Sequence, residues 1–269
     1  MRTCTTTIAI ALLLAVVASA QDSAAPERQR ELLHKGLNAF DEAVAVAKDD
    51  PRQAHALYRQ AASAFELLAA TGVRSAGLEY NLGNTYFRLG ELGRAIAHYR
   101  RAEQLDPTDT QIHANLEYAR NRVEPFISAG GTEKLLARLQ FWTRKVSVQR
   151  RFWIAAFASI AGWLGLIAWL RWRQRPVLVL GIIAILLGGA NAGSVTWQLH
   201  DHATHPHAVV VDGSHVLRLG RGEGYDPALT QQLGPGVELR ILRERGGWVE
   251  TRLADGNTGW LPVGAIEKI

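Results

Sequence analysis

The side chains best suited to bind a metal ion are concentrated between residues 200 and 207. This segment reads His-Asp-His-Ala-Thr-His-Pro-His, and His200, His202, His205 and His207 are candidate ligands for Zn²⁺, Cu²⁺ or Ni²⁺. Pro206 and the lack of a rigid predicted element favour a flexible His-rich linker (200–207) over a metal site. We therefore expect neither a metal nor a cofactor, and a metal sensor built on this linker stays open as a second alternative function.

The other reactive side chains form no recognisable catalytic pattern. The sequence contains no H-E-x-x-H, no G-x-S-x-G and no Walker loop. Gly220-x-Gly222-x-Gly224 has the wrong spacing for a phosphate loop, and no helix is predicted after it. The single cysteine, Cys4, lies close to the N-terminus, which argues against disulfides and Cys-nucleophile chemistry in the mature chain. We predict that the protein is not an enzyme.

The positive charge of the chain is confined to one region. The 269 residues carry a net charge of +5, from 30 Lys and Arg against 25 Asp and Glu. Residues 131–200 hold nine basic side chains, one acidic side chain and six of the eight Trp, together with the longest apolar runs. Basic, Trp-rich flanks around apolar runs are typical of a membrane segment. We therefore exclude nucleic acid as a partner and expect membrane lipid instead.

The N-terminus has the pattern of a secretory signal peptide. Arg2 is followed by an apolar run over residues 8–17 and then by Ala18-Ser19-Ala20, an A-x-A cleavage site. We predict that the signal peptide (1–20) is removed together with Cys4, while retention as an anchor stays open. An exported N-terminus would place the next domain outside the cytoplasm.

Residues 21–130 are predicted to form an all-α repeat domain. The periodicity indicates helices over 27–47 and 52–70. The next segment, 76–109, reads AGLEYNLGNTYFRLGELGRAIAHYRRAEQLDPTD and resembles the 34-residue tetratricopeptide repeat (TPR). Small residues of this pattern let two helices cross closely, tyrosines fill the space between repeats, and a proline ends the second helix. These structural positions are Leu82, Gly83, Tyr86, Ala95, Tyr99, Ala102 and Pro107. Residues 110–123 resemble a capping helix.

The first helices of TPR repeats line a concave groove that binds protein segments. A spacing of four places Tyr80, Asn84 and Arg88 on one helix face. Tyr118 and Arg122 occupy the equivalent face of the next helix. Asn and Arg beside aromatic rings could hold an extended peptide or an acidic chain end. For any one of these residues, an ordinary solvated helix face is the alternative.

Two uncharged runs, 152–170 and 177–199, predict a transmembrane helical hairpin. Each is long enough to cross a hydrocarbon core of roughly 30 Å. The short basic loop 171–176 contains three Arg and should face the cytoplasm. Two spans place the flanking domains on the same side. With an exported N-terminus, we predict a bacterial inner-membrane protein whose TPR and C-terminal domains face the periplasm.

Six basic residues before the first span oppose this orientation. They are Lys134, Arg138, Arg144, Lys145, Arg150 and Arg151. We interpret residues 131–151 as an amphipathic juxtamembrane helix that lies on the membrane, with its charges on anionic headgroups. The opposite topology, with both domains in the cytoplasm, stays open.

The C-terminal residues 208–269 change to a strand pattern. Short strands are predicted over 208–212, 216–219, 237–243, 248–253 and 258–261. The residues Gly247-Trp248-Val249, Asp255-Gly256, Gly259-Trp260-Leu261-Pro262 and Ile266 resemble those of the bacterial SH3 domain, which implies a small all-β barrel. Because such barrels often expose one aromatic side chain in a peptide or glycan-peptide groove, we expect Trp260 to lie there and Trp248 to lie in the core.

The predicted fold class is therefore multidomain, with an all-α helical repeat, a transmembrane hairpin and a small SH3-like barrel. This order of parts, with Y-N-L-G-N-T-Y-F-R-L-G and R-A-E-Q-L-D-P in the repeat, resembles the TPR member of the Bat aerotolerance-operon family. The resemblance implies a non-enzymatic membrane scaffold acting with von Willebrand factor A-domain membrane proteins and a MoxR-type ATPase in aerotolerance or envelope stress. Binding of peptidoglycan or a cell-wall peptide by the SH3-like domain stays open as the alternative function.

Overall fold

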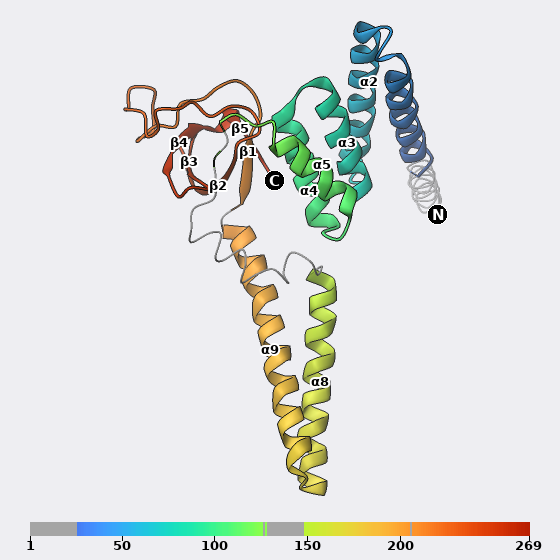
Figure 1. The fold of residues 1–269 in the computed structure, drawn as a ribbon, viewed down its shortest axis with the longest axis vertical. Helices are drawn as coiled ribbons and strands as arrows, with labels where there is room; N and C mark the ends of the chain where they lie inside the picture. The colour runs from blue at the N-terminus through green and yellow to red at the C-terminus, as the bar shows by residue number, and fades with distance from the viewer. Residues whose placement is uncertain (1–25, 126, 128–147, 205) are drawn as a thin grey trace, which may run out of the picture. The chain divides into compact units, whose positions relative to one another are not determined.

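The computed structural model describes residues 26–125, 127, 148–204 and 206–269 (Figure 1). The chain divides into two compact units between Gly90 and Glu91. The described part of the first unit is helical. The described part of the second contains two short helices, a pair of long apolar helices and one β-sheet. The predicted signal peptide (1–20) and most of the predicted juxtamembrane helix (131–151) lie outside the described residues.

The first unit contains a helix over residues 26–46, then α2 (Pro51–Ala70) and α3 (Ala76–Leu89). Asp50 caps α2 by accepting hydrogen bonds from the N–H groups of Arg52 and Gln53, and Pro51 opens its first turn. The Ser75 hydroxyl caps α3, and Gly90 ends it in the left-handed region at φ 79°. Because these signals are local, the helix boundaries expected from the sequence agree closely with the structure.

Aromatic side chains join the helices of the first unit. Gly36 lies against the ring of Phe65, where an added Cβ would come within 2.6 Å of Cδ1, so this approach requires glycine. Phe40 and Tyr58 make an edge-to-face contact with 5.4 Å between ring centroids. The Tyr86 hydroxyl of α3 donates to the Glu66 carboxylate of α2. These contacts fix the helices to one another within this unit.

The second unit begins with α4 (Leu92–Leu105) and α5 (Thr110–Arg120), which pack together. In the turn between them, the Asp106 carboxylate accepts hydrogen bonds from the hydroxyl and N–H groups of Thr108, at 2.8 and 3.0 Å. These two bonds lower the pKa of Asp106. Asp109 then caps α5 by accepting from the N–H groups of Gln111 and Ile112.

The long apolar helices are α8 (Val148–Trp172) and α9 (Arg175–Thr204), which run side by side (Figure 1). Their segments Arg150–Trp172 and Arg175–Trp197 are long and apolar enough to cross a membrane, with mean hydropathies of 1.8 and 2.0. Only 11% of each segment's apolar window is buried, whereas the core helix of a soluble protein would be mostly buried.

Glycines bring these two helices into close contact. A Cβ on Gly165 would lie 3.2 Å from the Cα of Gly181, and a Cβ on Gly188 would lie 2.6 Å from the Ser159 hydroxyl. The connection is shorter than the predicted loop 171–176, because only residues 173–174 lie between the helices. Pro176 fits inside α9, since the first turn of a helix does not use its N–H groups.

Five strands form one antiparallel sheet in the order β4-β3-β2-β1-β5. They are β1 (His207–Val210), β2 (Glu238–Arg245), β3 (Trp248–Leu253), β4 (Thr258–Pro262) and β5 (Ile266–Lys268). β4 and β5 are the two edges, so the sheet is open where the sequence pattern predicts a closed barrel. Residues 266–268 were not expected to form a strand, because three residues are too short for a visible alternation.

The predicted strand over residues 216–219 is wrong. Arg218 makes only isolated bridges, to Pro227 and to Trp260 on the β4 edge. The physical reason is the sequence that follows: three glycines between residues 220 and 224, and then Pro227, which has no N–H group with which to extend a ladder.

The core of the sheet module consists of alternate strand residues and apolar side chains from the loop between β1 and β2. Fully buried members are Ala208, Val210, Leu217, Leu233, Val249 and Leu261. Trp248 is half-buried rather than a core residue, because it lies at the start of β3, next to the exposed Gly246-Gly247 turn. Trp260 is also half-buried.

Candidate protein-interaction site

The residues expected to build the repeat lie on α3, on α4 and in the turn that follows. On α3, Leu82, Gly83 and Tyr86 are buried. On α4, Ala95, Tyr99 and Ala102 are buried. Pro107 is half-buried in the turn before α5. Each of the two helices therefore has an inward face made of small and aromatic side chains.

The first group of candidate groove residues lies on α3. Tyr80 and Asn84 are half-buried and Arg88 is exposed, and a spacing of four places all three on one helix face. Of the three, Arg88 is therefore the side chain most open to solvent.

The second group lies where α5 ends. Tyr118 is in its last turn, whereas Arg122 lies in the turn that follows, because α5 stops at Arg120 rather than at the predicted residue 123. Tyr118 is 53% exposed, and the Arg122 guanidinium lies over its ring, 4.4 Å from the centroid. Arg122 also donates a hydrogen bond to the Tyr118 hydroxyl. A cation stacked on an exposed aromatic ring can contact both a carboxylate and an apolar side chain. The structure thus brings Tyr118 and Arg122 together as one amphipathic surface, which we call the Tyr118–Arg122 pair.

Trp260 lies on the β4 edge beside the loop between β1 and β2. Its backbone N–H donates to the carbonyl of Arg218, and the N–H of Arg218 donates back, at 2.8 and 3.1 Å. The Arg221 guanidinium lies 5.7 Å from the centroid of the Trp260 ring. Trp260 is therefore held by the sheet on one side and partly covered by a cation on the other.

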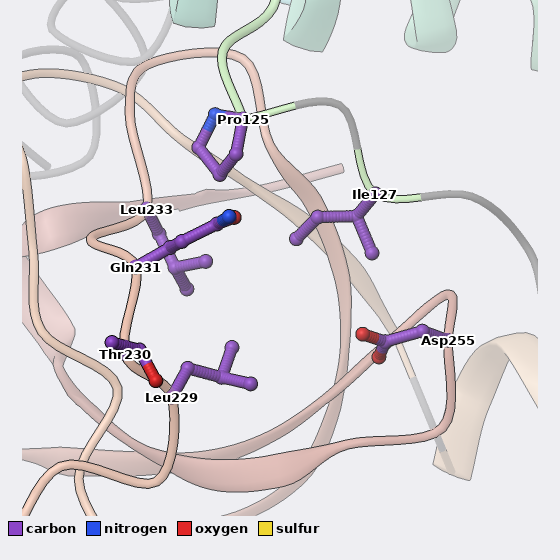
Figure 2. A pocket seen from close by; sticks show the side chains of 7 residues that line it. All are labelled: Pro125, Ile127, Leu229, Thr230, Gln231, Leu233 and Asp255. Carbon is purple, nitrogen blue, oxygen red and sulfur yellow. The ribbon is translucent and has the colours of Figure 1, made fainter.

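A shallow hollow of about 310 Å³ lies beside the same module (Figure 2). It is lined by Pro125, Ile127, Leu229, Thr230, Gln231, Leu233 and Asp255. Asp255 is the charged residue among these seven, and both of its carboxylate oxygens accept hydrogen bonds from Asn257, at 2.9 and 2.8 Å. This carboxylate therefore shapes the β3–β4 turn, and the sequence analysis did not single out this hollow.

The His-rich segment is placed only in part. α9 continues to Thr204, so residues 200–204 are helical rather than a loop, because no proline interrupts the helix before Pro206. The side chains of His200 and His202, and all of His205, lie outside what the structure describes. His207 lies on β1, opposite Arg240 on β2. Within the described ranges, no three His, Cys, Asp or Glu side chains are grouped to hold a metal ion.

A network of charged side chains that no sequence pattern predicts joins α4, α5 and β2. Glu238 accepts two hydrogen bonds from Arg120, at 2.5 and 3.1 Å, and pairs with Arg100 at 2.7 Å. Arg100 also pairs with Glu103 at 2.7 Å, and Glu103 lies 3.1 Å from His113. Because Glu238 follows Arg100 and Arg120 by more than a hundred residues, no sequence spacing could have revealed this cluster.

Attraction between opposite charges outweighs burial in setting the pKa values of Glu238 and Arg100. Burial would raise the pKa of Glu238, but the charge of Arg100 and the hydrogen bond and charge of Arg120 outweigh burial and lower the pKa to about 2. Burial would likewise lower the pKa of Arg100, yet Glu238 and Glu103 raise it. Glu238 and Arg100 therefore both stay charged at neutral pH.

Comparison with known proteins identifies one module of the chain. The model of the tetratricopeptide repeat family matches residues 76–109. Residues 76–109 are a TPR repeat. The match begins directly after the α3 cap Ser75, spans α3 and α4, and ends at Asp109, the cap of α5. TPR repeats are typically non-catalytic modules that bind proteins, so the chain contains a module for protein interaction. Among curated proteins, no significant match to the chain is found.

Proposed function

We propose that this protein is a non-enzymatic, membrane-anchored scaffold whose TPR region binds partner proteins. The observation that carries this proposal is the TPR repeat at 76–109, followed by α5 with its exposed Tyr118–Arg122 pair. An aromatic ring beside a guanidinium suits an extended segment with an acidic group or a free carboxylate. Tyr80, Asn84 and Arg88 on α3 offer the same combination of side chains.

The α8–α9 hairpin is the proposed membrane anchor. Its apolar surface supports this role, since large apolar side chains such as Phe157, Trp163 and Leu186 are 62–66% exposed. A hairpin that crosses the membrane twice leaves α4, α5 and the sheet on the same side. The predicted signal peptide favours the periplasmic side of a bacterial inner membrane.

The proposed setting is a Bat-type aerotolerance or envelope-stress complex. Support comes from the order of TPR repeat, apolar hairpin and C-terminal β module, and from the sequence resemblance described above. The partners implied are von Willebrand factor A-domain membrane proteins and a MoxR-type ATPase. A scaffold of this kind needs no catalytic residues, because its role is to hold partners close together.

Site-specific photo-crosslinking in cells tests the scaffold proposal. A crosslinking amino acid at Arg122 or Arg88 should capture the same small set of membrane-associated proteins. Replacing Tyr118 with Ala should remove the adducts formed at Arg122. The matched control is Gln104, which is exposed on the other helix of the repeat, α4, and should capture none of them. Equal capture at Gln104 and Arg122, or no capture at any position, would refute the proposal.

A second candidate function is binding of peptidoglycan or a cell-wall peptide by the β module, which we propose to be a relative of bacterial SH3 domains. The half-buried Trp260 with Arg221 over its ring favours this function, since this pair can contact both sugar and carboxylate. The purified full chain should then sediment with insoluble peptidoglycan. Trp260→Ala should abolish sedimentation, while Trp248→Ala, at the other half-buried Trp, should not. Sedimentation that survives Trp260→Ala would exclude this site.

A further inference from the structure

The β-sheet, rather than another helix, covers one side of α4. β1 and β5 contact α4 within the second unit. A Cβ on Gly93 of α4 would lie 2.6 Å from the Cα of Val211 and press against the carbonyl of Val210. Gly236, at φ 93° before β2, packs against α4 and the segment after α5: a Cβ there would lie 2.7 Å from Val123 and 3.0 Å from Ile96 of α4. Helices and sheet thus meet where a glycine on each side permits close packing.

Partly buried ion pairs reinforce this packing. The two-arginine fork of Arg100 and Arg120 holds the Glu238 carboxylate at the start of β2. Arg101 pairs with Glu267 on β5 at 2.6 Å and donates to the carbonyl of Lys268. The side chains of Arg100, Arg101, Glu238 and Glu267 are 22–29% exposed. Pairs shielded to this degree are weakened less by water than fully exposed pairs.

The contacts lie where a stack of repeats would need a cover. A terminal repeat leaves the inner faces of its last helices open unless a capping element packs on them. Gly93, Ile96 and Ala97 form such a face on α4, and all three are buried. Directly after α5, the side chain of Val123 packs on the apolar core of the sheet.

We propose that the five-stranded sheet is the C-terminal cap of the helical repeat and that Glu238 latches it to α4 and α5. The helices and the sheet then open together as one cooperative unit. The cap leaves the Tyr118–Arg122 pair exposed, so a partner can reach this pair while the latch is closed. The proposal concerns the chain's own architecture and holds whichever partner the scaffold binds.

Hydrogen exchange on the full chain in detergent, read by mass spectrometry, tests the latch. Glu238→Gln keeps the side-chain shape but removes the charge. Amide exchange in α4 and in β1 should then accelerate together, by roughly tenfold or more. Trypsin should also gain access to the Arg122–Val123 bond, because Val123 leaves the sheet core.

The matched control is Glu250→Gln, which breaks the 2.6 Å pair of Glu250 with Arg243 inside the same sheet, between β2 and β3. Its effect should stay within that hairpin. Arg101→Gln, a milder variant at the β5 contact, should accelerate exchange in α4 and β5 together, by less than Glu238→Gln. If Glu238→Gln accelerates exchange in β2 alone, or if Glu250→Gln opens α4 equally, the sheet is not a latched cap. If a crosslinking residue at Arg122 captures no partner, the scaffold proposal fails, but the expected exchange rates of these variants stay the same. The scaffold proposal and the latch proposal therefore fail separately.

Discussion

The partly buried Glu238 and the buried Tyr58 illustrate, at the scale of single residues, two opposite fates of a polar group inside a fold. Glu238 is held by two arginines across an interface. The Tyr58 side chain is 4% exposed among Phe40, Ala43 and Ala54, and its hydroxyl has no hydrogen-bond partner among the residues that the structure describes. A buried polar group stabilises a fold when it is paired and costs free energy when it is not.

Tyr58→Phe should therefore raise the free energy of unfolding of the first unit, by about 1 kcal/mol, because it removes the hydroxyl and keeps the ring. Thermal unfolding of the purified protein measures the change. Tyr86→Phe on α3 is the comparison, since the Tyr86 hydroxyl donates a hydrogen bond to Glu66 that the variant would lose. A Tyr58→Phe variant less stable than wild type would mean that the hydroxyl is paired after all.

The stability of the second unit should depend on acid through Glu238. Its pKa of about 2 lies below the ordinary value of 4.5, so the stabilisation is complete above about pH 4.5 and is lost as the pH falls toward 2. The difference amounts to about 3 kcal/mol, as an order of magnitude. The stability of wild type and of Glu238→Gln should therefore differ most near neutral pH and converge near pH 2. Denaturant unfolding at a series of pH values measures both curves, and a constant difference between them would contradict the assignment.

At the scale of elements, close packing of the hairpin depends on which glycines face the partner helix. Gly188 of α9 faces Ser159 of α8, whereas an added Cβ on its neighbour Gly189 would meet nothing within 4 Å. In a membrane, such small residues allow the contacts that hold two helices together.

Gly188→Leu should therefore loosen the hairpin, and Gly189→Leu should not. We expect a loss of about 2 kcal/mol for the first variant, the usual scale of overpacking, and little change for the second. Thermal unfolding in detergent micelles, followed by circular dichroism, compares the two. Equal losses would show that α8 and α9 do not pack through this glycine.

At the scale of the whole molecule, topology is the property on which the proposed function depends. A reporter active only outside the cytoplasm should be active when fused after Ile269 and inactive when inserted at Gln174, between α8 and α9. The reason is that two spans return the chain to its starting side and the arginine-rich turn stays inside. The reverse pattern would place the C-terminal module in the cytoplasm, and equal activity at both positions would exclude a two-span hairpin.

The sequence by itself predicted the repeat and the two apolar helices, which rest on local signals. The repeat is bounded by the caps Ser75 and Asp109, and the apolar runs appear as α8 and α9. Tyr118 and Arg122 also lie together, although Arg122 follows the end of α5 and is not on the helix face expected from its spacing. Strand pairing was predicted less well: residues 216–219 form no strand, and the sheet is open, because pairing depends on distant partners.

Only the tertiary structure decided how the helices and the sheet of the second unit meet. Glu238 lies far along the chain from Arg100 and Arg120. No periodicity or motif in the sequence therefore marks it as an interface residue. The same holds for Gly93, which in sequence is an ordinary helix glycine and in the fold faces the backbone of Val210 and Val211. Capping and turn energies act over a few residues and can be read along the chain. Desolvated ion pairs and backbone contacts exist only once distant segments have come together.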